Sequence, residues 1–168
     1  TITMTTGCQQ QSSLYFGTVE PRHGPKELWI NNSSEPEWLD PGRCSDSTGG
    51  EIIWNTFEGL VQAHPATLKP LPAIATHWDI SDDGRVYRFY LRPSFWSDGH
   101  PLTADDFVFA FQRLVDPQTG SKYASNGFIF QQGLAISRGE AAVNTLGVRA
   151  LDSHTLEIEL VDPLPYFL

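Results

Sequence analysis

Four side chains of types that commonly bind metals lie close together in the sequence: Asp98, His100, Asp105 and Asp106. Asp98 stands in a Ser-Asp-Gly sequence, where Asp typically bonds to its own backbone and Gly permits a turn. Asp106 follows Thr103 by three residues, which is the spacing of a capping box at the start of a helix. Because no second His or Cys stands at ligand spacing, we interpret the group as a turn and a helix cap and predict no metal site.

The sequence contains no standard arrangement for covalent catalysis or for phosphate binding. It has no Gly-x-Ser-x-Gly elbow and neither of the common Gly-rich phosphate loops. Cys44 and the five His residues form no pattern that pairs a nucleophile with a base. The segment 81–84 lacks the further oxygen ligands and the closing Glu of a calcium loop. We therefore expect a protein that is not an enzyme and that needs no cofactor.

Composition narrows the class of protein and its partners. The chain has 168 residues, 40% of them hydrophobic and 18% charged, which is typical of a folded chain with a core. Twenty acidic side chains against eleven basic ones argue against nucleic-acid binding, which needs clustered Lys and Arg. No run of about 18 apolar residues is present, so we expect no membrane-spanning helix.

Apolar periodicity predicts the elements that must position any site. A strand is expected over residues 27–31 and a helix over 48–62, followed by an extended, proline-rich crossing over 63–77. Three tryptophans are expected to pack in the interior, because large aromatic side chains dominate buried area. They are Trp54, Trp78 and Trp96.

Two hairpins and a helix are predicted in the remainder. Asp83-Gly84 is a strong turn signal between strands at 78–80 and 85–92. The capped helix begins after Thr103 and ends at Asp116-Pro117. Residues 118–145 give little signal beyond a short helix over 135–143.

The second hairpin pairs residues 147–151 with 155–161. In its second strand, Leu156 and Ile158 alternate with Glu157 and Glu159, which predicts a sheet with one solvated face. The order strand, helix, hairpin, helix, hairpin indicates an α+β fold with a mostly antiparallel sheet.

A run of short motifs then identifies a resemblance. W-S-D-G-x-P-L-T-A-x-D-F occupies residues 96–107. Others appear in order on both sides, at 35–41, 57–61, 73–78, 81–84, 87–92, 112–117, 123–125, 147–152, 155–156 and 162–167. From about residue 27 onward, the chain resembles bacterial extracellular solute-binding proteins of family 5, the oligopeptide- and dipeptide-binding proteins that supply ABC importers.

The resemblance implies a two-lobed periplasmic-binding-protein fold, type II-like and of the peptide-binding cluster, in a protein of several hundred residues. The chain is then expected to be an N-terminal portion. Residues 1–26 would be a tether, residues 27–56 the first segment of the large lobe, and residues 57–168 a smaller inserted domain.

The resemblance also implies a binding site. In peptide-binding members, the loop after Leu-Asp-Pro pairs with the main chain of the ligand, which here places the contact at Ser45, Asp46 and Ser47. Tyr123, in the Tyr-Ala-Ser motif, is expected to reach the same cleft. The alternative for the three-residue segment is an ordinary solvated loop.

The N-terminal region resembles the cleavage site of a bacterial lipoprotein, with Cys8 as the lipidated residue and a polar tether after it. The alternatives are a free Cys8 or a disulfide with Cys44, the other cysteine of the chain. With a lipid on Cys8, Cys44 would be a small buried hydrophobic side chain. The expected location is the periplasm or cell envelope, with contact to the membrane only through this anchor.

The implied function is capture of an extended oligopeptide between two closing lobes of a monomer, followed by delivery to an ABC permease and its ATPase. Alternatives with the same fold bind a nickel chelate, haem or an oligosaccharide. A secreted hydrolase and an adhesion or scaffold module are further alternatives.

Overall fold

The structure is a computed structural model that describes residues 31–168, and Ser33–Leu168 form one compact unit. The predicted tether, Cys8 and most of the predicted strand at 27–31 lie outside the described residues. Helices and antiparallel sheets are mixed in this unit, so the predicted α+β class is confirmed.

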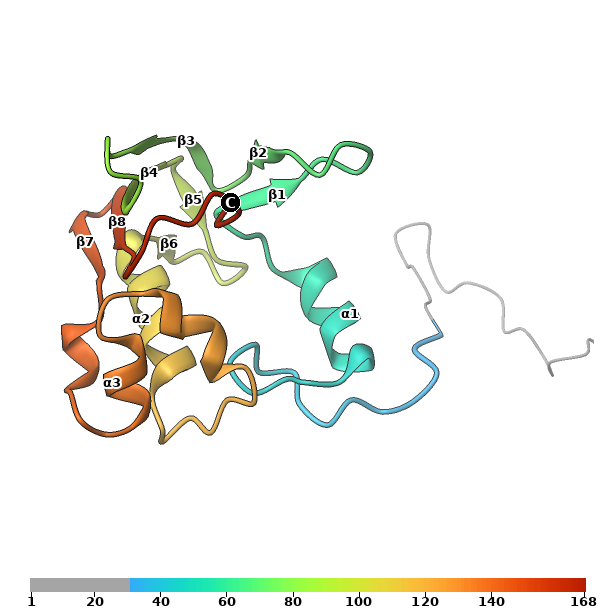
Figure 1. Cartoon of the computed structure of the whole chain (residues 1–168). Coiled ribbons are helices and arrows are strands. Elements are labelled where there is room, and N and C mark those ends of the chain that lie inside the picture. Colours follow the sequence, from blue (N-terminus) through green and yellow to red (C-terminus); the bar gives the residue numbers. More distant parts are fainter. Residues whose placement is uncertain (1–30) are drawn as a thin grey trace, which may run out of the picture. The chain divides into compact units, whose positions relative to one another are not determined.

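The main sheet has four antiparallel strands in the order β3-β4-β8-β7 (Figure 1). Their bounds are β3 Ala75–Ile80, β4 Val86–Leu91, β7 Val148–Asp152 and β8 Thr155–Glu159. Both predicted hairpins are therefore confirmed, and β4 and β8 pair in the middle of the sheet. The first hairpin turns where predicted: Gly84 has φ +70° and its N–H donates to the carbonyl of Ser81 at 2.8 Å.

The first helix is shorter than predicted. α1 spans Ser47–Thr56, and the backbone of Phe57 is already extended. Gly59 follows, a residue that disfavours helix, and the chain continues as β1 (Val61–Ala63) paired with β2 (Pro70–Pro72). The predicted helix over residues 57–62 and the single extended crossing over 63–77 are both wrong. Within residues 31–168, α1 makes no extensive contact with another helix or strand.

The capped helix is confirmed as α2 (Ala104–Val115). The N–H of Thr103 donates to the carboxylate of Asp106 at 2.7 Å. The turn before it is built as predicted, since Gly99 has φ +90° and the N–H of His100 donates to the carboxylate of Asp98 at 3.0 Å. This turn joins the short strands β5 (Ser94–Phe95) and β6 (Pro101–Leu102).

Residues 118–145 form short helical segments. They are η1 (Ala124–Ile129), α3 (Gly133–Ser137) and η2 (Val143–Thr145). The predicted helix over 135–143 is right only up to Ser137, because Gly139 turns the chain with φ +72°. Backbone bonds hold this region to β8: the N–H of Gln131 donates to the carbonyl of Glu159 at 2.9 Å.

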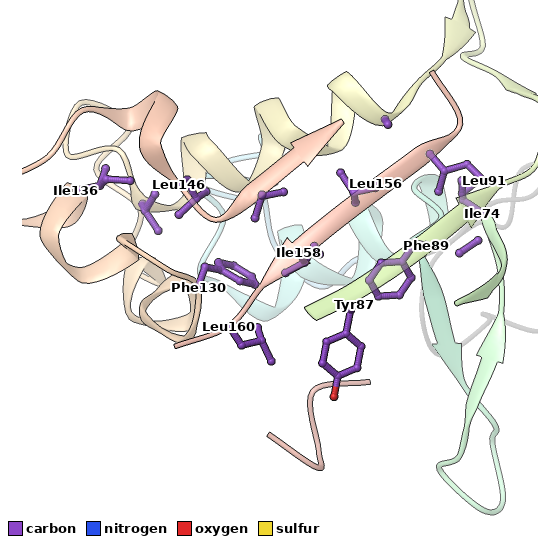
Figure 2. Packing of buried hydrophobic residues seen from close by; sticks show 14 residues of the cluster. Ile74, Tyr87, Phe89, Leu91, Phe130, Ile136, Leu146, Leu156, Ile158 and Leu160 are labelled. Atoms are coloured by element: carbon purple, nitrogen blue, oxygen red, sulfur yellow. The ribbon is translucent and has the colours of Figure 1, made fainter. Parts of the chain in front are cut away.

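The core lies between one face of the main sheet and α2. Figure 2 shows its side chains gathered along β4 and β8. Tyr87 lies at one end, with its hydroxyl directed toward the C-terminal segment, where it donates to the carbonyl of Leu164 at 3.4 Å. Trp78 packs against this core as predicted. The prediction is wrong for Trp54, which is 85% exposed, and for Trp96, which is 38% exposed.

The outer face of the sheet is less solvated than predicted. Glu157 points to that face, yet its side chain is only 5% exposed. The neighbouring strands cover it with two arginines: Arg88 donates to Oε2 at 2.6 Å, and Arg149 donates to Oε1. Burial alone would raise the pKa of Glu157, but the bonds from both arginines and their charges bring it below its ordinary value.

Replacing this carboxylate is expected to destabilise the fold. Glu157→Gln keeps the size but removes both ion pairs, and we expect a loss of about 1–3 kcal/mol at pH 7. Because folding lowers the pKa of Glu157, its ion pairs stabilise the fold at pH values above the pKa of this group in the unfolded chain. That stabilisation is lost as the pH falls through the lower pKa of the folded chain. Urea unfolding at pH 7 and pH 3 should therefore show that the difference in free energy of unfolding between Glu157→Gln and the parent is smaller at pH 3.

The matched control for that experiment is Glu140→Gln, since Glu140 is exposed. It should unfold like the parent at both pH values. An equal gap between Glu157→Gln and the parent at pH 7 and at pH 3 would contradict the ionic role of Glu157.

Candidate functional site

The segment predicted to contact a peptide lies at the N-terminus of α1. Asp46 is the N-cap residue, and its carboxylate accepts the N–H of Gly49 at 2.7 Å. This hydrogen bond from Gly49 is the main reason why the pKa of Asp46 lies below its ordinary value. Ser45 precedes the cap and Ser47 is the first helical residue. The segment is thus a tightly turned helix start, and its side chains are partly or fully exposed.

Close backbone packing fixes this helix start against the preceding loop. A Cβ on Gly49 would lie 2.6 Å from the carbonyl oxygen of Trp38 and 2.8 Å from Sγ of Cys44. Such distances are too short for any side chain, so Gly49 permits the approach. The indole of Trp38 in turn lies 4.0 Å beneath the guanidinium of Arg43. The loop and the helix start therefore form one packed unit.

An ion pair connects this loop to α2. Arg113 donates from both terminal nitrogens to the two carboxylate oxygens of Asp40, at 2.9 and 2.6 Å. Principally through these bonds, Arg113 lowers the pKa of Asp40. Nothing in the sequence pairs these residues, which stand 73 positions apart.

Tyr123 lies in the segment that follows α2. Its side chain is 51% exposed, and the residue is the N-cap that precedes η1. The adjacent Lys122 pairs with Glu37 at 3.4 Å, in the loop that leads to Asp40. The structure therefore ties the loop before Ser45 both to α2 and to the neighbour of Tyr123.

An open, apolar groove lies beside this region. Phe57 and Trp96 meet edge to face, with centroids 6.4 Å apart, and both line two adjoining hollows of about 420 and 450 Å³. Phe109 on α2 contributes to the second hollow and is 62% exposed. Sequence reasoning assigned Trp96 to the core and missed this groove, because apolar periodicity does not distinguish a buried surface from an uncovered one.

The side chains first considered as metal ligands instead form the turn before α2 and the cap of that helix. Asp98 and His100 form an exposed pair at 3.1 Å, while Asp106 caps α2. Within residues 31–168, no group of three His, Cys, Asp or Glu side chains is placed to hold a metal. In that same part of the chain, every helix is too short or too polar to span a bilayer.

Cys44 is partly buried, with its thiol 3.6 Å from the carbonyl oxygen of Asp46. The predicted alternatives for Cys8, a lipid, a free thiol or a disulfide with Cys44, lie outside the described residues; Cys44 itself, predicted to be buried, is only partly so.

Comparison with known proteins gives a consistent picture. Residues 69–168 match the family model described as bacterial extracellular solute-binding proteins, family 5 middle. The chain is 44% identical over 149 residues to the probable deoxycholate-binding periplasmic protein of Escherichia coli, covering 85% of this chain and 27% of that protein. It is 42% identical over 146 residues to the periplasmic oligopeptide-binding protein of the same organism, covering 82% and 25%.

A solved structure agrees with these relatives. The substrate-binding domain of an oligopeptide ABC transporter from Bacillus anthracis superposes with a TM-score of 0.73 at 44% identity, over 77% of this chain and 25% of that one. The chain thus spans about a quarter of the length of the curated relatives that it matches.

Proposed function

Because the chain belongs to family 5 of the bacterial extracellular solute-binding proteins, we propose that it forms part of a cleft that captures extended oligopeptides for an ABC importer. The mechanism is binding without chemical change. Two lobes close around the ligand by hinge motion, and the closed form docks on the permease and its ATPase. The observation that carries the proposal is the match to oligopeptide-binding relatives, one of them named as part of an ABC transporter.

The proposed contacts are Ser45, Asp46, Ser47 and Tyr123. Backbone pairing with residues 45–47 would supply affinity without reading ligand side chains, at roughly 1 kcal/mol net for each hydrogen bond. Tyr123 would add a flat apolar face with a polar tip, and its exposure leaves that face accessible. The carboxylate and the carbonyl of Asp46 already bond the first turn of α1, so pairing with the ligand would rest on the other backbone groups of the segment.

The domain arrangement and location belong to the same proposal. Residues 27–56 would be the first segment of the large lobe, and residues 57–168 a smaller domain inserted in it, after a tether over 1–26. The relatives named periplasmic support the same location for this chain. Lipid attachment at Cys8 and action as a monomer complete the proposal, and the intact mass of the expressed protein tests the lipid.

A chimera tests the binding proposal. This chain would replace the matching quarter of the E. coli oligopeptide-binding protein and be titrated calorimetrically with tri- to pentapeptides. We expect micromolar or tighter binding by the chimera and none by residues 1–168 alone, because a partial cleft cannot desolvate the ligand. A folded chimera that releases no heat with any peptide would refute the function, and micromolar binding by the chain alone would refute the two-lobed mechanism.

A substitution in the chimera tests the contact at Tyr123. Tyr123→Ala is expected to weaken peptide binding about tenfold, a change of about 1.4 kcal/mol. Tyr166→Ala is the matched control, since Tyr166 is 78% exposed and lies at the C-terminal end of the chain. Equal affinities of the two variants would remove Tyr123 from the site.

A second candidate ligand is an amphipathic steroid acid. The observation in its favour is the 44% identity to a probable deoxycholate-binding protein. The same titration with deoxycholate separates the candidates: heat with deoxycholate and none with peptides would select the second.

A further inference from the structure

The ion pair between Asp40 and Arg113 has the geometry of a clamp. Its two bonds run in parallel between both guanidinium ends and both carboxylate oxygens, at 2.9 and 2.6 Å. This fork-to-fork arrangement fixes orientation as well as distance. Both side chains are about one-third exposed, at 33% for Arg113 and 30% for Asp40, so water screens the pair only in part.

Asp40 also organises the turn that leads into the proposed contact segment. Its carboxylate accepts the N–H of Gly42 at 2.9 Å. Its carbonyl accepts the N–H groups of Arg43 at 3.0 Å and of Cys44 at 2.9 Å. The next residue is Ser45. Asp40 therefore bonds to α2 through its side chain and also accepts the backbone hydrogen bonds of the turn that ends just before Ser45.

We propose that Asp40 and Arg113 are positioning residues that hold the backbone of residues 45–47 in fixed register with α2, and thereby with Tyr123. This inference rests on the proposed function. Arg113 lies in the last turn of α2, and Tyr123 lies in the segment that follows that helix. The clamp thus links the loop that leads into residues 45–47 to the helix that precedes Tyr123.

The arrangement differs from that of an ordinary surface ion pair. Arg85 and Asp83 are two residues apart, about half exposed, and joined within one turn, so their pairing constrains only that turn. Asp40 and Arg113 connect segments that are 73 residues apart. Lysine could not replace Arg113 fully, because an ammonium is a point charge without the paired donors of a guanidinium.

The first test needs no ligand and uses the 168-residue chain. Amide hydrogen exchange would be compared in the parent, Arg113→Ala and the control Arg85→Ala. We expect at least tenfold faster exchange at Gly42, Cys44 and Gly49 in Arg113→Ala only. Unchanged exchange at these three amides would overturn the clamp, whatever the chain binds.

The second test measures peptide affinity in the chimera, below the unfolding temperature of every variant. Arg113→Ala is expected to raise Kd about tenfold, and Arg113→Lys is expected to recover part of that loss. Because the two groups act as one unit, adding Asp40→Asn to Arg113→Ala should cause no further loss.

The outcomes separate the two proposals. A parent chimera that binds no peptide refutes the function, while the exchange experiment still decides the clamp. A parent chimera that binds, with Arg113→Ala binding equally well, overturns the clamp and leaves the function in place. Independent, additive losses from the two substitutions would also overturn it.

Discussion

Phe89→Ala is expected to cost about 3–5 kcal/mol of the free energy of unfolding. Phe89 is 1% exposed in the middle of β4 and faces Leu156 across the strand pair. Its ring lies 6.3 Å from that of Trp78 and 6.4 Å from that of Tyr87, so truncation leaves a cavity that rigid neighbours cannot fill. Since domains are stable by only about 5–15 kcal/mol, this one change is expected to move the urea midpoint markedly.

The matched control is Phe95→Ala. Phe95 is 69% exposed, so its truncation removes little buried surface and should change the free energy of unfolding by no more than about 0.5 kcal/mol. Phe89→Leu extends the series in case the alanine variant does not fold, with a smaller loss expected. Equal midpoints for Phe89→Leu, Phe95→Ala and the parent would refute the placement of the core.

Gly133→Ala is the second substitution with a large expected effect. A Cβ there would lie 2.0 Å from the carbonyl oxygen of Gly127 and 2.9 Å from its carbonyl carbon. Both atoms are backbone, so η1 and α3 would have to separate. We expect this clash to lower the free energy of unfolding by about 3 kcal/mol. That loss exceeds the gain of about 1 kcal/mol that replacing Gly by Ala in a helix normally gives. Thermal unfolding followed by circular dichroism should show Tm lower by about 5–10 °C.

Gly50→Ala controls for the chemistry of the substitution. Gly50 lies in α1, and a Cβ there would meet nothing within 4 Å. It should leave Tm unchanged or slightly raised. The close contact between η1 and α3 would be refuted by a Gly133→Ala protein as stable as the parent.

The sequence predicted those elements whose signals are local. Alternation in β8 placed Leu156 and Ile158 on one face, and both are buried there. The cap at Thr103 placed the start of α2 correctly, because both bonding groups lie within one turn. Turn chemistry at Asp83-Gly84 did the same for the first hairpin.

Elements that depend on distant partners could not be predicted. Residues 118–145 are held by backbone bonds to β8 and by the contact of Gly127 with Gly133, which leave no periodic pattern. Glu157 was assigned correctly to the outer face, but its burial comes from arginines on two other strands. Apolar periodicity also continued past Thr56, because Leu60 and Val61 reach the core from outside the helix.

The candidate site shows the same limit. The residues themselves gave no reason to single out Ser45, Asp46, Ser47 or Tyr123; the resemblance to a family did. Even that resemblance did not indicate the pairing of Asp40 with Arg113, since only the folded chain brings such distant positions together.

The isolation of α1 affects the thermodynamics of binding. Within residues 31–168, this helix makes no extensive contact with another helix or strand. A helix of ten residues is marginal in water by itself, so it frays unless something covers its apolar side. If a ligand or the other lobe supplies that cover, capture and local folding become a single event. The heat capacity change on capture would then be more negative than the area of direct contact alone explains.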